Sequence, residues 1–305
     1  MAKSPLCGVF AAAVTPLNPD YSPALSDLPP LLDFLARRGC HGALILGTTG
    51  EGPSFSPAER RLIWQAAMKV REAHPDFRLL AGSGTPSLEE TIELTRTAFD
   101  LGMDGVVVLP PYYFRKAGEE GLFAWFSQVL KRAVPSQGAF FGYHIPSVSG
   151  VPLSLDLLAR LKEAFPFRFA GIKDSSADAQ HAIQLGERFG EDLVVFNGND
   201  PLFSLALQNH ASGCITALAN LASPKLRKVW EAHQRGETDE PAQADLKVAR
   251  SLMDRYPPAS PLLKALLAWQ FRFPRWTVKP PLTPLPAEVE EKVLVEAQTV
   301  FQVSA

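Results

Sequence analysis

The chain has 305 residues, a length that suits one α/β barrel with a short extension as well as two small domains. Hydrophobic residues make up 46% of the sequence and charged residues 20%, which is typical of a folded protein with a large core and excludes a disordered chain. The net charge is -2 and the basic residues are scattered, so nucleic acid is not expected as a partner.

The distribution of residue types also argues against a membrane-spanning protein, a disulfide-bonded protein and a metalloprotein. No apolar stretch approaches the ~18 residues that a membrane-spanning helix needs. Cys7, Cys40 and Cys214 lie far apart with no C-x-x-C pair, which favours a reducing compartment and predicts a cytoplasmic protein. The histidines form no H-E-x-x-H motif and no close group with metal-ligand spacing, so no metal is expected.

Eight short apolar segments are predicted to be strands. They are rich in β-branched residues and nearly continuously apolar, so both faces of each should be buried, as in a parallel sheet covered by helices. In chain order they are GVFAAAV (8–14), GALILG (42–47), RLLAGSG (78–84), DGVVVLPP (104–111), AFFGYHIP (139–146), FRFAGIKD (167–174), DLVVFNG (192–198) and SGCITAL (212–218).

The segments between these strands have helical periodicity, and two of them carry clear start signals. Ser56 precedes a proline and has Glu59 three residues on, which predicts a capping box for a helix that runs to residue 74. Ser87 and Glu90 repeat the pattern, and Gly102 is placed to end that helix.

Alternating strands and helices predict a (β/α)8 TIM barrel. The alternative is an open doubly wound sheet, but no G-x-G-x-x-G follows the first strand, which counts against a dinucleotide-binding form. After the eighth unit, two helices separated at Pro257 and Pro258 and a last helix over 286–300 are expected. We therefore expect a catalytic barrel over 1–235 and a C-terminal helical extension over 236–305, packed on the barrel to cover its apolar side chains.

Active sites of such barrels are built from the residues that follow the carboxyl ends of the strands. Lys173 ends the sixth strand. It could be a lysine that extends into solvent, or a buried amine that attacks a carbonyl in its neutral form. Tyr143 ends the fifth strand, either as a core tyrosine or as a proton shuttle. His144 should point the opposite way and is expected to be structural.

The stretch GTTGEG follows the second strand. Glycines around Thr48 and Thr49 let backbone N–H groups converge, and with two hydroxyls they could bind a carboxylate. The alternative is a simple turn between strand and helix. The Lys-Ser/Thr that ends a nucleotide-binding loop is absent from this stretch.

Four motifs in this order resemble the pyruvate-dependent class I lyase family of dihydrodipicolinate synthase and N-acetylneuraminate lyase. They are GTTGE from Gly47, PPYYF from Pro110, YHIPSVSG from Tyr143 and GIKDSS from Gly171. The resemblance covers the barrel and extends to VKPPLTPLP in the tail.

The resemblance implies a role for each matching residue. Lys173 would form a Schiff base with the C2 carbonyl of pyruvate or another 2-oxo acid, with Thr48 and Thr49 beside the carboxylate. Tyr143 would move protons, relayed through Thr48 and Tyr113. No cofactor other than this covalent imine is implied, and an iminium at C2 is an electron sink that lets a C3–C4 bond break or form.

The resemblance also implies a homo-oligomer, because family members place the tyrosine matching Tyr113 across a subunit interface in a dimer or tetramer. Ile215 would contribute a backbone carbonyl to the site. Gly198 and Asp200, at the end of the seventh strand, complete the expected substrate-binding set together with Val148.

Two departures from the family pattern bear on the substrate. Dihydrodipicolinate synthases carry an arginine five residues after the catalytic tyrosine, and Val148 stands there, unable to bind a second carboxylate. Neuraminate lyases show an acidic pair after the seventh strand, whereas Asp200 is followed by Pro201. The site pattern is closest to aldolases of 2-keto-3-deoxy sugar acids, whose hydroxyls could be bound by Ser147, Ser149, Thr216 and Asp200.

The leading hypothesis is therefore an aldolase that reversibly cleaves a 2-keto-3-deoxy sugar acid to pyruvate and an aldehyde. The alternatives are dihydrodipicolinate synthase, with an arginine such as Arg115 supplied from elsewhere, and a dehydratase or hydratase-aldolase of the same family. A non-catalytic barrel that binds a 2-oxo acid is the alternative outside enzymes.

Overall fold

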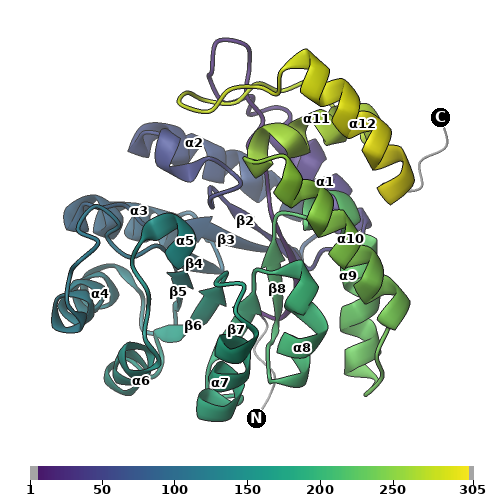
Figure 1. Cartoon of the computed structure of the whole chain (residues 1–305). Coiled ribbons are helices and arrows are strands. Elements are labelled where there is room, and N and C mark those ends of the chain that lie inside the picture. Colours follow the sequence, from purple (N-terminus) through teal and green to yellow (C-terminus); the bar gives the residue numbers. More distant parts are fainter. Residues whose placement is uncertain (1–5, 302–305) are drawn as a thin grey trace.

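The computed structural model describes residues 6–301, and its eight parallel strands form a closed barrel in chain order (Figure 1). This confirms the predicted TIM barrel. Each strand lies inside its predicted segment and is shorter, because residues at one or both ends of each segment belong to the loops. The strands are β1 (Gly8–Ala12), β2 (Gly42–Ile45), β3 (Arg78–Gly82), β4 (Gly105–Val108), β5 (Ala139–His144), β6 (Phe169–Asp174), β7 (Val194–Asn197) and β8 (Gly213–Thr216).

Helices connect successive strands and form the outer layer. They are α1 (Leu28–Arg37), α2 (Pro57–Met68), α3 (Leu88–Asp100), α4 (Glu119–Ala133), α6 (Leu155–Ala164), α7 (Ala179–Phe189), α8 (Phe203–Gln208) and α9 (Ala219–Gln234). Four short pieces lie in the loops: the one-turn helix α5 (Pro146–Ser149) and the 3-10 turns η1 (Gly52–Ser54), η2 (Lys69–Glu72) and η3 (Asp200–Leu202).

Both predicted helix starts are confirmed. Ser56 and Glu59 form a reciprocal capping box at the start of α2, which ends at Met68 and continues as the 3-10 turn η2. The Ser87 hydroxyl accepts a hydrogen bond from the Glu90 N–H at the start of α3. Gly102 follows that helix with a φ of +85°, in the left-handed region where glycine is favoured.

The apolar core has two parts, divided by the barrel wall. One lies between the strands and the surrounding helices, and the other fills the barrel interior with Phe10, Phe141, Phe196 and their neighbours. Because side chains alternate across a strand, this division decides which residues face the inside. Tyr143 belongs to the inner cluster, as predicted.

The C-terminal extension consists of α10 (Glu240–Arg255), α11 (Ala259–Phe271) and α12 (Ala287–Phe301), drawn in green to yellow in Figure 1. It packs on the barrel as expected. Its leucines at positions 262, 263, 266 and 267 are fully buried, and Trp269 is half-buried. Between residues 6 and 301, the structure contains no helix with both the length and the apolar character needed to cross a membrane.

Candidate active site

Lys173 and Tyr143 lie side by side inside the barrel. They are paired across neighbouring strands β6 and β5, so both side chains project to the same face. The Lys173 ammonium lies 4.2 Å from the centre of the Tyr143 ring. Lys173 is only 3% exposed, which rules out the alternative that it extends into solvent. The structure therefore places an amine and a phenol together inside the barrel, near the carboxyl ends of β5 and β6.

Several groups act on the Tyr143 phenol. Burial raises its pKa, but the positive charge of Lys173 and hydrogen bonds with Thr48, Lys173 and Ser175 outweigh burial, so the net pKa is lowered. Ser175 was not singled out from the sequence, although it lies two residues after Lys173 and so on the same face of the chain. A Cβ at Gly198 would lie 2.0 Å from the Ser175 hydroxyl, so glycine at this position makes room for that serine.

The loop after β2 brings the threonine pair to the mouth of the barrel. Thr48 is exposed, and its hydroxyl oxygen lies 3.4 Å from the Tyr143 hydroxyl. Thr49 is buried, and its carbonyl accepts a hydrogen bond of 2.9 Å from the Ser260 hydroxyl in α11. The structure thus brings together Thr48, Tyr143 and Lys173 as the sequence predicted.

Glu51, in the same loop, was not singled out from the sequence. Its side chain is fully buried and forms an ion pair of 2.6 Å with the equally buried Lys264 of α11. Its second carboxylate oxygen accepts a hydrogen bond of 2.8 Å from the Lys279 N–H. Burial lowers the pKa of Lys264, and the Glu51 carboxylate opposes that shift. The sequence signal that could have identified Glu51 is its position as a charged residue between two glycines in the loop after a strand.

Arg60 is a second buried charged residue near the site that was not singled out from the sequence. Arg60, at the start of α2, lines a small cavity together with Thr48 and Tyr143. Its Nε donates a hydrogen bond of 3.1 Å to the Phe55 carbonyl, and burial lowers its pKa. The sequence places Arg60 on a helix of mixed polarity, where its burial could not be distinguished from exposure.

Residues at the outer rim of the mouth are exposed. Tyr113 is 76% exposed and its ring packs edge-on against Phe114, with 5.2 Å between ring centres. Within residues 6–301, no hydrogen bond joins Tyr113 to Thr48 or Tyr143. Val148 is 56% exposed, so an apolar side chain faces solvent at the position where the synthases carry arginine.

Arg115 lies at the rim near Gly150, two positions after Val148 in the sequence. A Cβ placed on Gly150 would lie 2.7 Å from Cδ of Arg115, so the arginine side chain packs over this glycine. Gly150 follows the one-turn helix that contains Val148 and adopts a φ of +68°. The loop after β4 therefore brings an exposed guanidinium to the loop after β5.

Asp200 is buried rather than open to the mouth. Its carboxylate accepts a hydrogen bond of 2.7 Å from the Thr216 hydroxyl and pairs with Arg250 of α10 at 3.3 Å. Burial raises the pKa of Asp200 despite these two partners. The neighbouring Ile215 places its side chain in the barrel interior. Of the predicted hydroxyl groups, Ser149 donates to the Ile145 and Val151 carbonyls, and Ser147 is exposed.

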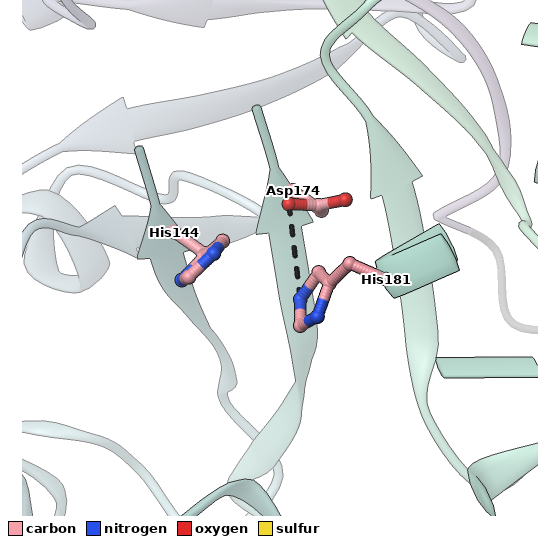
Figure 2. Close-up of side chains that lie close together, drawn as sticks. All are labelled: His144, Asp174 and His181. Carbon is pink, nitrogen blue, oxygen red and sulfur yellow. Dashed lines mark ion pairs between the residues drawn. The ribbon is translucent and has the colours of Figure 1, made fainter. Parts of the chain in front are cut away.

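A group of two histidines and a carboxylate lies on the outer side of the barrel wall, behind the Lys173–Tyr143 pair. Figure 2 shows His144 and Asp174, from neighbouring strands, close to His181 of α7, and ligand atoms of all three lie within 4.8 Å of one another. The two imidazoles stack with 4.7 Å between ring centres. Residue types and spacing alone would suit a metal ion.

Within this group, the hydrogen bond of His144 does not suit a metal ligand, whereas Nε2 of His181 is buried without a hydrogen-bond partner among the described residues. Burial lowers the pKa of His144 to about 4, which keeps the ring neutral, and its Nδ1 accepts a hydrogen bond of 3.0 Å from the Leu153 N–H. A neutral imidazole has one lone pair, so Nε2 must carry the proton and cannot coordinate. Both Asp174 oxygens accept hydrogen bonds from Ser176. His144 therefore has a structural role, as expected from the sequence.

Comparison with known proteins covers nearly the whole chain. A model of the dihydrodipicolinate synthetase family matches residues 5–299. An uncharacterized DapA-like lyase of Chloroflexus aurantiacus is 40% identical over 285 residues, which cover 92% of each chain. A 4-hydroxy-tetrahydrodipicolinate synthase of Thermus thermophilus is 30% identical over 291 residues, 93% of this chain and 94% of its own.

The fold has close counterparts among solved structures. The E. coli K12 prophage protein YagE, solved in complex with pyruvate, superimposes with a TM-score of 0.90 over 97% of this chain and 98% of its own, at 24% identity. At that identity the likeness concerns the fold, while the family match rests on the sequence. The chain belongs to the dihydrodipicolinate synthetase family and is a pyruvate-dependent lyase of the kind that works through a lysine Schiff base.

Proposed function

We propose that Lys173 is the Schiff-base lysine and that the protein reversibly cleaves a 2-keto-3-deoxy sugar acid to pyruvate and an aldehyde. The observation that carries this proposal is the buried Lys173 amine against the Tyr143 ring, with Thr48 above them at the mouth. A buried amine next to a phenol of lowered pKa is suited to forming an imine and moving protons around it.

The reaction follows from this arrangement. The neutral Lys173 amine attacks C2 of the 2-oxo acid, and loss of water gives an iminium. When the C4 hydroxyl loses its proton, the C3–C4 bond breaks, its electrons pass into the iminium, and the aldehyde leaves. The remaining enamine takes a proton at C3, and hydrolysis of the imine releases pyruvate and restores the lysine.

Tyr143 is the group placed to exchange the C4 hydroxyl proton. Its lowered pKa makes the phenolate more accessible near neutral pH, and the Thr48 hydroxyl at 3.4 Å can pass the proton toward the mouth. Thr48 and Thr49 would hold the substrate carboxylate through hydroxyl and backbone N–H groups. Gly198 and Ile215 would line the same space through their backbones.

The substrate class is inferred from the rim. Val148 offers no charge for a second carboxylate, and Ser147 beside it is an exposed hydroxyl that could bind a hydroxyl of a sugar acid. The Asp200 carboxylate already has Thr216 and Arg250 as partners, so direct sugar binding there stays a prediction that requires one of these contacts to open.

Borohydride reduction in the presence of pyruvate, followed by peptide mass spectrometry, tests the imine. A reduced adduct is expected on Lys173 and should be absent in Lys173→Ala. Lys162, a half-buried lysine on α6 whose Nζ donates to the Pro166 carbonyl, provides a control away from the site, since Lys162→Ala should label normally. An intact wild-type protein that forms no adduct would refute the proposal.

Turnover tests the substrate. Pyruvate release from 2-keto-3-deoxygluconate and related sugar acids should vanish in Lys173→Ala and fall about 10²- to 10⁴-fold in Tyr143→Phe, while Tyr143→Phe still forms some imine. Release of water without an aldehyde would instead identify a dehydratase of the same family.

Arg115 favours a second candidate, dihydrodipicolinate synthase. Its side chain packs over Gly150 beside Val148, and so could offer the second carboxylate a cation from another loop. Condensation of pyruvate with aspartate semialdehyde, abolished by Arg115→Met and retained in the neighbouring Lys116→Met, would support this candidate. A background rate in the wild-type protein would eliminate it.

The proposal also includes a homo-oligomer in the cytoplasm. Tyr113 and Phe114 form an exposed aromatic pair at the rim, the kind of surface that subunit contacts bury. Sedimentation analysis should show a dimer or tetramer, and substitution of both rings by serine should weaken it. A wild-type monomer at micromolar concentration would contradict this part.

A further inference from the structure

Glu51 is part of the turn that carries Thr48 and Thr49, residues 47–52, here called the threonine loop. The Glu51 N–H donates to the Thr48 carbonyl at 3.1 Å, and the Gly52 N–H donates to the Gly47 carbonyl at 3.1 Å, which closes the turn around the two threonines. Glu51 itself adopts a φ of +57°, in the left-handed region that non-glycine residues rarely occupy. Such a conformation persists only where surrounding contacts hold it.

Those contacts come from the C-terminal extension. Lys264 Nζ donates to one Glu51 oxygen at 2.6 Å and to the Thr277 carbonyl at 2.6 Å. The Lys279 N–H donates to the other Glu51 oxygen at 2.8 Å. The Ser260 hydroxyl adds a separate bond to the Thr49 carbonyl. Both Glu51 oxygens are thus used, and the carboxylate has a fixed orientation.

A fully buried ion pair is a poor means of adding stability. Removing two charges from water costs about as much as their attraction returns, and an apolar pair of similar size is often at least as stable. The pair instead fixes the orientation of the Glu51 carboxylate, because each hydrogen bond sets an angle as well as a distance. Because Glu51 lies only two residues after Thr49, fixing its carboxylate also restricts the conformation of the threonine loop.

We propose that Lys264 is a positioning residue for the substrate carboxylate: through Glu51 it holds Thr48 and Thr49 in the conformation that binds a 2-oxo acid. This inference rests on the proposed function, in which the threonines bind that carboxylate. Lys264 touches no substrate. It acts from α11, outside the barrel, on a loop more than 200 positions earlier in the chain.

The test compares four variants with the wild-type protein, one of them Ser260→Ala. Lys264→Met leaves Glu51 charged and buried, and it could fold poorly for that reason alone. The double variant Lys264→Met/Glu51→Met replaces the ion pair by apolar groups, so it should keep the thermal midpoint close to the wild type while losing the orientation. Lys225→Met breaks an ion pair with Asp245 away from the loop and is the matched control.

In the double variant we expect KM for pyruvate, or the pyruvate concentration that gives half-maximal borohydride trapping, to rise about tenfold or more. The rate at saturating pyruvate should change less than about threefold, because Lys173 and Tyr143 are untouched. Ser260→Ala should shift KM in the same direction by a smaller factor, and Lys225→Met should leave it unchanged.

Methyl pyruvate separates loss of carboxylate binding from general damage, since it keeps the ketone and lacks the charge. Its half-maximal trapping concentration should be the same in the wild type and in the double variant. A folded double variant with wild-type KM for pyruvate would overturn the inference, as would an equal rise for methyl pyruvate. A wild-type protein that traps no pyruvate would instead overturn the proposed function, so the two failures are distinguishable.

Discussion

Arg250 should contribute several kcal/mol to stability, mainly through its ion pair with Asp200, because its other partner, Asp254, is exposed and such pairs contribute little. The Asp200 side chain is fully buried and that of Arg250 is 25% exposed. Removing one partner of a buried pair usually costs about 3–5 kcal/mol, because the other charge is left without compensation. The Thr216 hydroxyl stays on Asp200, so we expect Arg250→Met to lower the free energy of unfolding by about 3 kcal/mol, the lower end of this range.

The loss should depend on pH, with a sign fixed by Asp200. Burial raises the pKa of Asp200 in the folded protein, so its contribution to stability is present at low pH and is lost as pH rises through that pKa. Without Arg250 the pKa should rise further. The difference in unfolding free energy between wild type and Arg250→Met should therefore widen as the pH rises through the folded-state pKa of Asp200 in the wild type.

Urea unfolding followed by tryptophan fluorescence at one protein concentration measures both quantities. In an Asp200→Asn background, Arg250→Met should cost far less, because no buried charge remains. Arg255 lies on the same helix as Arg250 and pairs with Glu296 of α12 near the surface, so Arg255→Met is the control and should change stability little. The reasoning is refuted if Arg250→Met costs no more than this control, or if its cost is independent of pH.

Three further predictions concern the helix cap and the catalytic pair. Ser56→Ala removes the hydroxyl that accepts from the Glu59 N–H, while the Ser56 backbone N–H keeps its bond to the Glu59 carboxylate. The change should cost about 1 kcal/mol, seen as a lower thermal midpoint, and an unchanged midpoint would show that α2 does not need its cap. Gly198→Ala would place a methyl 2.0 Å from the Ser175 hydroxyl and should lower the free energy of unfolding in urea by about 1–3 kcal/mol. Adding Ser175→Ala to this variant should restore part of the lost stability. If no stability is recovered, another contact is responsible for the loss. Lys173→Met removes the cation that lowers the pKa of Tyr143, so the phenol should ionise at higher pH in an ultraviolet difference titration against Tyr143→Phe, and an unchanged midpoint would contradict the electrostatic argument.

The barrel and the placement of Lys173 beside Tyr143 could be predicted because both depend on local pattern. Continuous apolar segments identified all eight strands, and alternation along a strand placed Tyr143 inside and His144 outside. Lys173 and Tyr143 end neighbouring strands, so a closed barrel brings them together whatever the loops do.

The surroundings of the site could not be predicted because they depend on pairs far apart in sequence. The ion pairs of Glu51 with Lys264 and of Asp200 with Arg250 form only when the extension packs on the barrel. Asp200 was expected to face substrate because it ends a strand, yet η3 turns its carboxylate toward Thr216 and α10. Single-sequence patterns carry no information about such tertiary partners.

The ties between the threonine loop and the C-terminal extension also affect how the protein is made. Ribosomes add roughly 5–20 residues per second, so Lys264 and Lys279 emerge ten seconds or more after Glu51 has been synthesised. Until then the Glu51 carboxylate lacks the two partners that hold it in the folded chain. The last quarter of the polypeptide thus completes a loop near the beginning, and a nascent chain ending after α9 would have all eight strands without a finished substrate pocket.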